Sequence, residues 1–84
     1  MSKGIEQEKR FAARLSRIRK ARSLTQQQVA DAAGVSRQAV ALAEVGQKRI
    51  RLSDAVDISD ALDVPLLDML SPEPMRLHVS VPID

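Results

Sequence analysis

The stretch TQQQVADAAGVSRQAVALAE, residues Thr25–Glu44, decides the fold. Its hydrophobic spacing predicts two short helices, Gln26–Ala33 and Arg37–Val45, with a tight turn at Gly34 between them. Ala30 is small where the two helices have to meet. Such a helix-turn-helix unit leaves the outer face of its second helix free to enter the major groove of DNA.

Capping residues mark the ends of these two helices. Thr25 is a good N-cap for the first helix, and Gln28, three residues on, can complete a capping box. Ser36 is the expected N-cap of the second helix, which ends at Gly46. The local sequence therefore specifies both helices and the turn between them.

Three further helices are expected around this unit, over residues 6–22, 52–62 and 65–70. In the first of them, Phe11, Leu15 and Ile18 recur at i, i+4 and i+7 and form one apolar face. The inward-facing residues expected of the helix at 52–62 are Leu52, Ala55, Val56, Ile58 and Leu62. We therefore expect an all-α fold, with residues 1–70 as one domain.

The pattern changes after residue 70, where prolines at positions 72 and 74 interrupt helix formation. Apolar residues then alternate with polar ones, which is typical of a strand: Met75, Leu77, Val79 and Val81. A lone strand leaves its backbone groups unpaired, so we expect residues 71–84 to form a linker and a strand that pairs with its copy in a homodimer. A frayed tail is the alternative, which the prolines favour.

The composition limits the classes of function. The chain has 84 residues, no cysteine and one histidine, which excludes a disulfide framework, thiol catalysis and a Cys- or His-based metal site. It offers no nucleophile–base pair and no phosphate-cradling glycine loop, so we expect no enzyme activity, no metal and no cofactor. No apolar run approaches the roughly 20 residues that span a bilayer, and the lack of cysteine weakly favours a cytoplasmic protein.

The net charge of +2 is unevenly distributed along the chain. Residues 1–22 carry eight Lys or Arg and two Glu, a net +6, whereas residues 51–84 carry two Arg and seven acidic residues, a net −5. A basic half favours a polyanionic partner, so we expect it to face DNA and the acidic helices to face away. Ordinary solvated helix faces are the alternative.

Three stretches carry a resemblance to a known family: IRKARSLTQQQVADAAGVSRQAV, Glu44-x-Gly46 and ALDVPLLDML. Together they resemble the Cro/repressor-type helix-turn-helix proteins, the Xre family, over about Leu15–Leu70. The resemblance implies a five-helix, lambda-repressor-like fold and recognition of double-stranded DNA by the third helix. It also implies binding as a homodimer to two-fold-related half-sites.

The resemblance places base contacts on the third helix. The residues it implies are Ser36, Arg37 and Gln38. Ala41 and Leu42, further candidates for base contact, stand where the family often has polar residues. Arg can bond to O6 and N7 of guanine, and Gln to N6 and N7 of adenine. Leu42 is expected to be exposed and suits either a thymine methyl or a protein contact. For Arg37 the alternative is a phosphate contact or an exposed residue near the cap.

Other residues are expected to contact the phosphate backbone. The resemblance gives this role to Gln26, for which a plain helix-start residue is the alternative. The loop after the third helix and the first helix supply the other candidates: Lys48, Arg49, Arg51, Arg17 and Arg22. For the loop residues, a solvated loop is the alternative.

The resemblance also implies structural roles. Arg19 and Glu44 match the family's ion pair between the first helix and the end of the third, which orients the third helix. Ser23 and Asp63 stand where glycine is common in the family, so both turns are expected to be strained. Ala43 stands where a larger apolar residue is frequent, which implies a thinner core under the third helix or compensation by Leu42 or Val45.

The function expected from these features is that of a homodimeric repressor, which excludes polymerase by occupying its operator. The alternative is a protein-interaction module, such as an antitoxin that masks a toxin and also represses its own operon. Antitoxins of the Hip type are similar in having a short strand after this fold.

Overall fold

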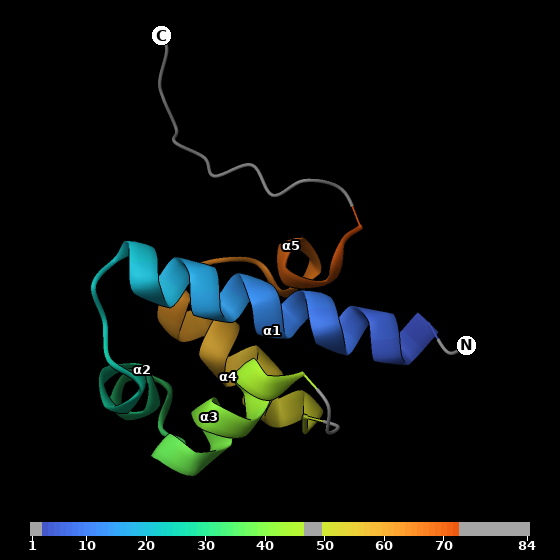
Figure 1. Ribbon diagram of the computed structural model, residues 1–84. Helices are drawn as coiled ribbons and strands as arrows, with labels where there is room; N and C mark the ends of the chain where they lie inside the picture. Colours follow the sequence, from blue (N-terminus) through green and yellow to red (C-terminus); the bar gives the residue numbers. More distant parts are fainter. Residues whose placement is uncertain (1–2, 47–49, 73–84) are drawn as a thin grey trace, which may run out of the picture.

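The computed structural model describes residues 3–46 and 50–72, which form five helices. These are α1 Lys3–Ala21, α2 Gln26–Ala33, α3 Arg37–Val45, α4 Leu52–Leu62 and α5 Leu66–Leu70. α1 crosses the molecule and lies between α5 on one side and α2 and α3 on the other (Figure 1). The all-α, five-helix fold is confirmed. α1 begins at Lys3 instead of Glu6, and α5 begins after Pro65, which is its N-cap.

One apolar core joins all five helices. Phe11, Leu15 and Ile18, the predicted apolar face of α1, are at most 5% exposed. The other buried hydrophobic residues come from every helix: Ala12, Val29, Ala30, Val40, Ala43, Ala55, Ile58, Leu62 and Met69. The helix-turn-helix unit is therefore anchored on α1 by burial of apolar surface, the main favourable term in folding.

The inward face predicted for α4 is wrong at two positions. Leu52 is 72% exposed and Val56 is 36% exposed. The buried apolar residues of α4 are at positions 55, 58 and 62, which follow the spacing of one helical face. Positions 52 and 56 are in one row with the buried Ser59 at i, i+4 and i+7, and this row becomes more exposed toward the start of α4. Two apolar side chains of α4 are thus left on the surface.

Four residues at helix ends have left-handed backbone conformations. Ser23 and Asp63 both have φ of +59°, which is the strain expected where a glycine is absent. Gly34 and Gly46 both have φ of +73°. A Cβ at Gly46 would lie 3.0 Å from the Cβ of Ala12, whereas one at Gly34 would meet nothing within 4 Å. Gly46 therefore also allows the end of α3 to approach α1 closely.

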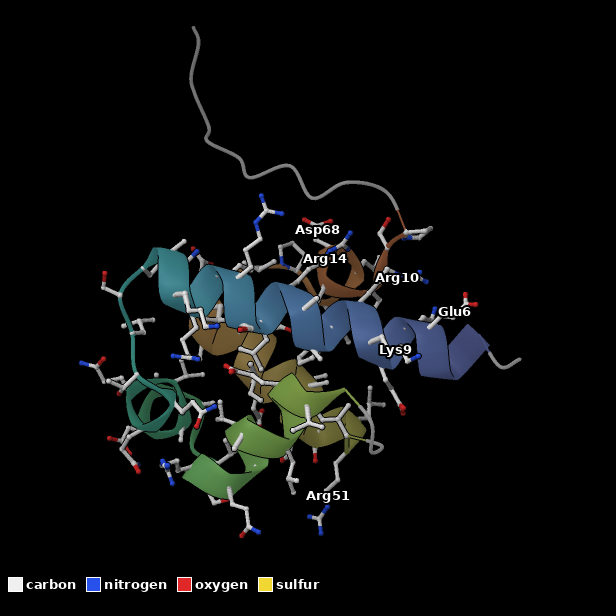
Figure 2. The ribbon with its side chains drawn as sticks, viewed as in Figure 1. Glu6, Lys9, Arg10, Arg14, Arg51 and Asp68 are labelled. Carbon is white, nitrogen blue, oxygen red and sulfur yellow. The ribbon has the colours of Figure 1, made fainter. Side chains whose placement is uncertain are left out.

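Arginines of α1 bind the carbonyl end of α5. Arg10 Nε donates to the Leu70 carbonyl at 2.9 Å, and Arg14 Nη1 donates to the carbonyls of Asp68 and Ser71 at 2.6 Å each. Figure 2 shows both arginines on the side of α1 next to α5. α5 has no basic residue in its own last turn, so α1 supplies positive charge to the negative end of that helix dipole.

The end of α4 is bound in the same way. Arg22 Nη1 donates to the Leu62 carbonyl at 2.7 Å, and α4 also lacks a basic residue in its last turn. Three arginines of the basic α1 segment thus stabilise helix ends within the fold. The sequence does contain a signal for these contacts. The last turns of α4 and α5 have no basic residue of their own, so a cation from another segment is needed there to complement the helix dipole.

Candidate nucleic-acid interface

Both helices of the helix-turn-helix unit, α2 and α3, begin at the caps that the sequence predicts. Thr25 Oγ1 accepts a hydrogen bond from the Gln28 N–H at 3.0 Å, and Gln28 Oε1 accepts one from the Thr25 N–H at 2.8 Å. Gly34 then turns the chain in the left-handed conformation. Ser36 Oγ accepts a hydrogen bond from the Ala39 N–H at 3.0 Å. The left-handed turn at Gly34 and the Ser36 cap together fix the direction in which α3 leaves the turn.

The end of α3 is fixed by an ion pair. Arg19 Nε donates to Glu44 Oε2 at 2.6 Å, and Arg19 Nη2 donates to Glu44 Oε1 at 3.0 Å. Arg19 Nη1 also donates to the Leu24 carbonyl at 2.9 Å, and Gln26 Nε2 donates to Glu44 Oε1 at 3.2 Å. The Arg19 and Glu44 side chains are 14% and 9% exposed, and the hydrogen bond to Glu44 raises the pKa of Arg19. This network joins α1, the start of α2 and the end of α3.

One face of α3 points away from the core. Its positions follow the i, i+3, i+4, i+7 spacing and hold Gln38, Ala41, Leu42 and Val45. Gln38 is exposed, Leu42 is 43% exposed and Val45 is 54% exposed. The predicted exposure of Leu42 is confirmed, and Leu42 lines the same groove as the small Ala43.

A groove of about 470 Å³ lies between α3 and α4. α3 packs mainly on α1 and α2, and the small Ala39 and Ala43 line the groove on the α3 side. The thinner core expected under α3 stays a prediction, and the groove beside Ala39 and Ala43 supports it. Polar residues on its walls include Ser36, Gln38, Arg51, Asp54 and Asp57.

A model of the helix-turn-helix family matches residues 15–69, from the middle of α1 into α5. The chain belongs to the Xre/Cro-type helix-turn-helix family. Its members are DNA-binding regulators and are generally not enzymes. No curated protein matches the sequence. In this helix-turn-helix protein, α3 occupies the position of the recognition helix.

Charges around the recognition helix differ from the expected division into a basic and an acidic half. Arg37 and Arg51 are exposed, and Figure 2 shows Arg51 pointing to the side of the molecule where α3 lies. Asp54 and Asp57 line the same groove as Arg51, so the acidic residues of α4 do not all face away from α3. The orientation of the acidic helices away from DNA stays a prediction, and the positions of Asp54 and Asp57 give it little support for α4.

The basic residues of α1 do not form one surface next to the recognition helix. Arg22 points to the end of α4, as described above. Arg17 is exposed and stands at i+3 from Arg14, on the face of α1 that meets α5. The phosphate contacts expected of Arg17 and Arg22 stay predictions, and the positions of these side chains give them little support.

Several expected site residues lie outside the described residues. They are Lys48, Arg49, Met75, Leu77, Val79 and Val81. Their roles in phosphate binding and dimerisation stay predictions. In residues 3–46 and 50–72, no group of His, Cys, Asp and Glu is arranged to hold a metal ion. Within the same ranges, no helix is long and apolar enough to cross a membrane.

Proposed function

We propose that this helix-turn-helix protein is a sequence-specific repressor that acts in the cytoplasm as a homodimer, with α3 of each subunit in the major groove of its operator. The observation that carries the proposal is the way α3 is held. Ser36 caps its start and the Arg19–Glu44 pair holds its end, while its outer face is exposed. A recognition helix fixed in this way loses little further freedom when it binds.

Base contacts are proposed at the start of α3. Arg37 and Gln38 are exposed there and can bond bidentately to guanine and adenine, with about 1–3 kcal/mol of discrimination for each well-formed pair. Ser36 uses its Oγ as the cap acceptor, so its hydroxyl hydrogen is available to a base. Ala41 and Leu42 follow on the same side and add apolar contacts.

Phosphate contacts are proposed on both sides of α3. Gln26 donates one amide hydrogen to Glu44, which orients the amide and leaves a second hydrogen for a phosphate. Arg51 is exposed at the groove, and Lys48 and Arg49 precede it in the same loop. Each phosphate neutralised steepens the dependence of log affinity on log salt by about 0.9.

The proposed homodimer rests on the alternating sequence of the C-terminal segment. Met75, Leu77, Val79 and Val81 would pair antiparallel with their copies across a two-fold axis. Two recognition helices related in this way would meet half-sites about 34 Å apart. Deletion of residues 72–84 tests the pairing: sedimentation should change from dimer to monomer, and an unchanged dimer would rule the strand out.

The DNA-binding function is tested by selecting bound sequences from random DNA. We expect a two-fold-related consensus, and weaker binding with reduced preference at one base pair each for Arg37→Ala and Gln38→Ala. Lys20→Ala is a matched control, because Lys20 is an exposed cation of α1. Equal affinity for all sequences, or no effect of either α3 substitution, would contradict the proposal.

A second function, binding of a protein partner such as a toxin, is favoured by exposed apolar side chains of α4 and α5. Leu52 of α4 and Leu67 of α5 are 72% and 78% exposed. Large exposed apolar side chains can mark a site of protein interaction. This role is compatible with the first, since antitoxins commonly repress their own operon. Co-purification of a stoichiometric partner, lost in Leu52→Ser or Leu67→Ser, would support it.

A further inference from the structure

We propose that the apolar strip of α3, formed by Ala41, Leu42 and Val45, reads the methyl groups of thymines, so that each half-site carries a short thymine-rich segment. Val45 thereby becomes a specificity-determining residue in addition to those at the start of the helix. This inference rests on the proposed binding of operator DNA by α3, and it specifies what kind of sequence that operator contains.

The strip continues directly from the exposed Gln38. Gln38 and Val45 are seven residues apart, which is about 10 Å along a helix axis. Successive bases of one strand are about 3.4 Å apart along the duplex axis, so the strip extends over at most about three base-pair steps. The strip can therefore cover bases that adjoin the one contacted by Gln38.

The chemistry of the strip selects one major-groove group. Its side chains neither donate nor accept hydrogen bonds, and Leu42 and Val45 expose 43% and 54% of their surface. The C5 methyl of thymine is the apolar group on base edges of the major groove. The other bases offer polar atoms there, and covering them with an apolar side chain would leave them without hydrogen-bond partners.

Its surroundings favour DNA over a protein as the occupant of the strip. The strip lies on the recognition helix and begins beside Arg37 and Gln38, whose side chains are both exposed. Arg51 lines the groove next to Leu42 and points to the same side of the molecule as α3 (Figure 2). The exposed cations Arg37 and Arg51 complement a phosphate backbone, while Asp54 and Asp57 line the same groove as Arg51.

A uracil scan of the selected operator tests the inference. Uracil keeps every hydrogen-bonding atom of thymine and lacks only the C5 methyl. Each thymine of the operator is therefore replaced by uracil in turn, and the Kd of the full-length protein for each DNA is measured by fluorescence anisotropy. We expect about fourfold weaker binding for each thymine that faces the strip, as burial of one methyl-sized group predicts. Thymines outside the footprint should give no change.

Substitutions in the strip then assign the effect to its residues. In Leu42→Ala and Val45→Ala, the ratio of the Kd with uracil to the Kd with thymine should fall towards one at the facing position. Leu52→Ala, a substitution of an exposed apolar residue on α4, should keep the full ratio. Circular dichroism confirms that each variant is folded. A ratio unchanged in both strip variants would overturn the inference.

The remaining outcomes separate this inference from the proposed function. Sequence-specific binding that is insensitive to uracil at every position overturns the inference and leaves the repressor proposal standing. Unchanged DNA affinity in the strip variants, together with loss of a co-purifying protein, overturns it in favour of a protein surface. Absence of any sequence-specific binding overturns the proposed function, and the inference with it.

Discussion

The Arg19–Glu44 ion pair predicts a large and non-additive effect of substitution on stability. Glu44→Met removes the acceptor of two Arg19 hydrogen bonds, at 2.6 and 3.0 Å, and of the Gln26 bond at 3.2 Å. Arg19 would keep its bond to the Leu24 carbonyl, but its charge would remain in a site where only 14% of the side chain is exposed. The free energy of unfolding should therefore fall.

The burial of the pair sets the size of the effect. Removing one partner of a fully buried pair costs about 3–5 kcal/mol, whereas exposed pairs contribute at most about 1 kcal/mol. With side chains 14% and 9% exposed, we expect Glu44→Met to cost about 2–3 kcal/mol. For a domain of this size that corresponds to a Tm lower by roughly 10–20 °C. The double variant Arg19→Met with Glu44→Met strands no charge, so it should lose less than the sum of the single variants.

Urea denaturation followed by far-ultraviolet circular dichroism measures these changes, because the chain has neither Trp nor Tyr to report by fluorescence. Arg37→Met serves as control, since Arg37 is exposed and its loss should leave stability within about 0.5 kcal/mol of the unsubstituted protein. Additive losses in the double variant would refute the coupling. A loss for Glu44→Met no larger than that of the control would refute the reasoning from burial.

Three further predictions concern the turns and α1. Ser23→Gly relieves a left-handed non-glycine residue and should raise the free energy of unfolding by about 0.5–1 kcal/mol in urea, and a decrease would contradict the strain. Gly34→Ala should cost about 1–2 kcal/mol from its positive φ, whereas Gly46→Ala should cost about 1–3 kcal/mol more, because its Cβ would meet that of Ala12 at 3.0 Å. An equal decrease in the free energy of unfolding for the two alanine variants, measured in urea, would show that α1 shifts to accommodate the added methyl. Arg14→Ala should lower the Tm in a circular dichroism melt, because bonds to the end of α5 are lost, and should leave operator affinity unchanged by anisotropy. A weaker operator Kd would instead place Arg14 at the DNA.

The parts of the fold that sequence reasoning predicted are those with local signals. The bounds of α2 and α3 follow from Thr25, Gly34 and Ser36, each of which acts within a few residues of its own position. The exposure of Leu42 follows from its rotation around α3 relative to the buried Val40. Capping and helical periodicity are fixed by neighbours in the chain, so they can be predicted without knowledge of the tertiary fold.

The parts that were missed depend on packing between distant segments. Which flank of α4 is buried is decided by where α2 and α5 pack, and periodicity alone wrongly placed Leu52 and Val56 inside. The charge of α1 indicated a surface for DNA, but Arg10 and Arg22 bind carbonyls that are 60 and 40 residues away in the chain. A count of charges gives the sign of a segment but not the direction in which each side chain points.

The division of α3 into a buried side and an exposed side bears on how this protein can change its target. Val40 and Ala43 hold the helix in the core, whereas Gln38, Leu42 and Val45 are exposed. Substitutions at exposed positions typically alter stability by no more than about 0.5 kcal/mol. Under the proposed reading of an operator by α3, a new operator preference is accessible by one or two replacements that leave the scaffold intact, and duplicated copies of the gene could diverge to separate operators while sharing the same folding requirements.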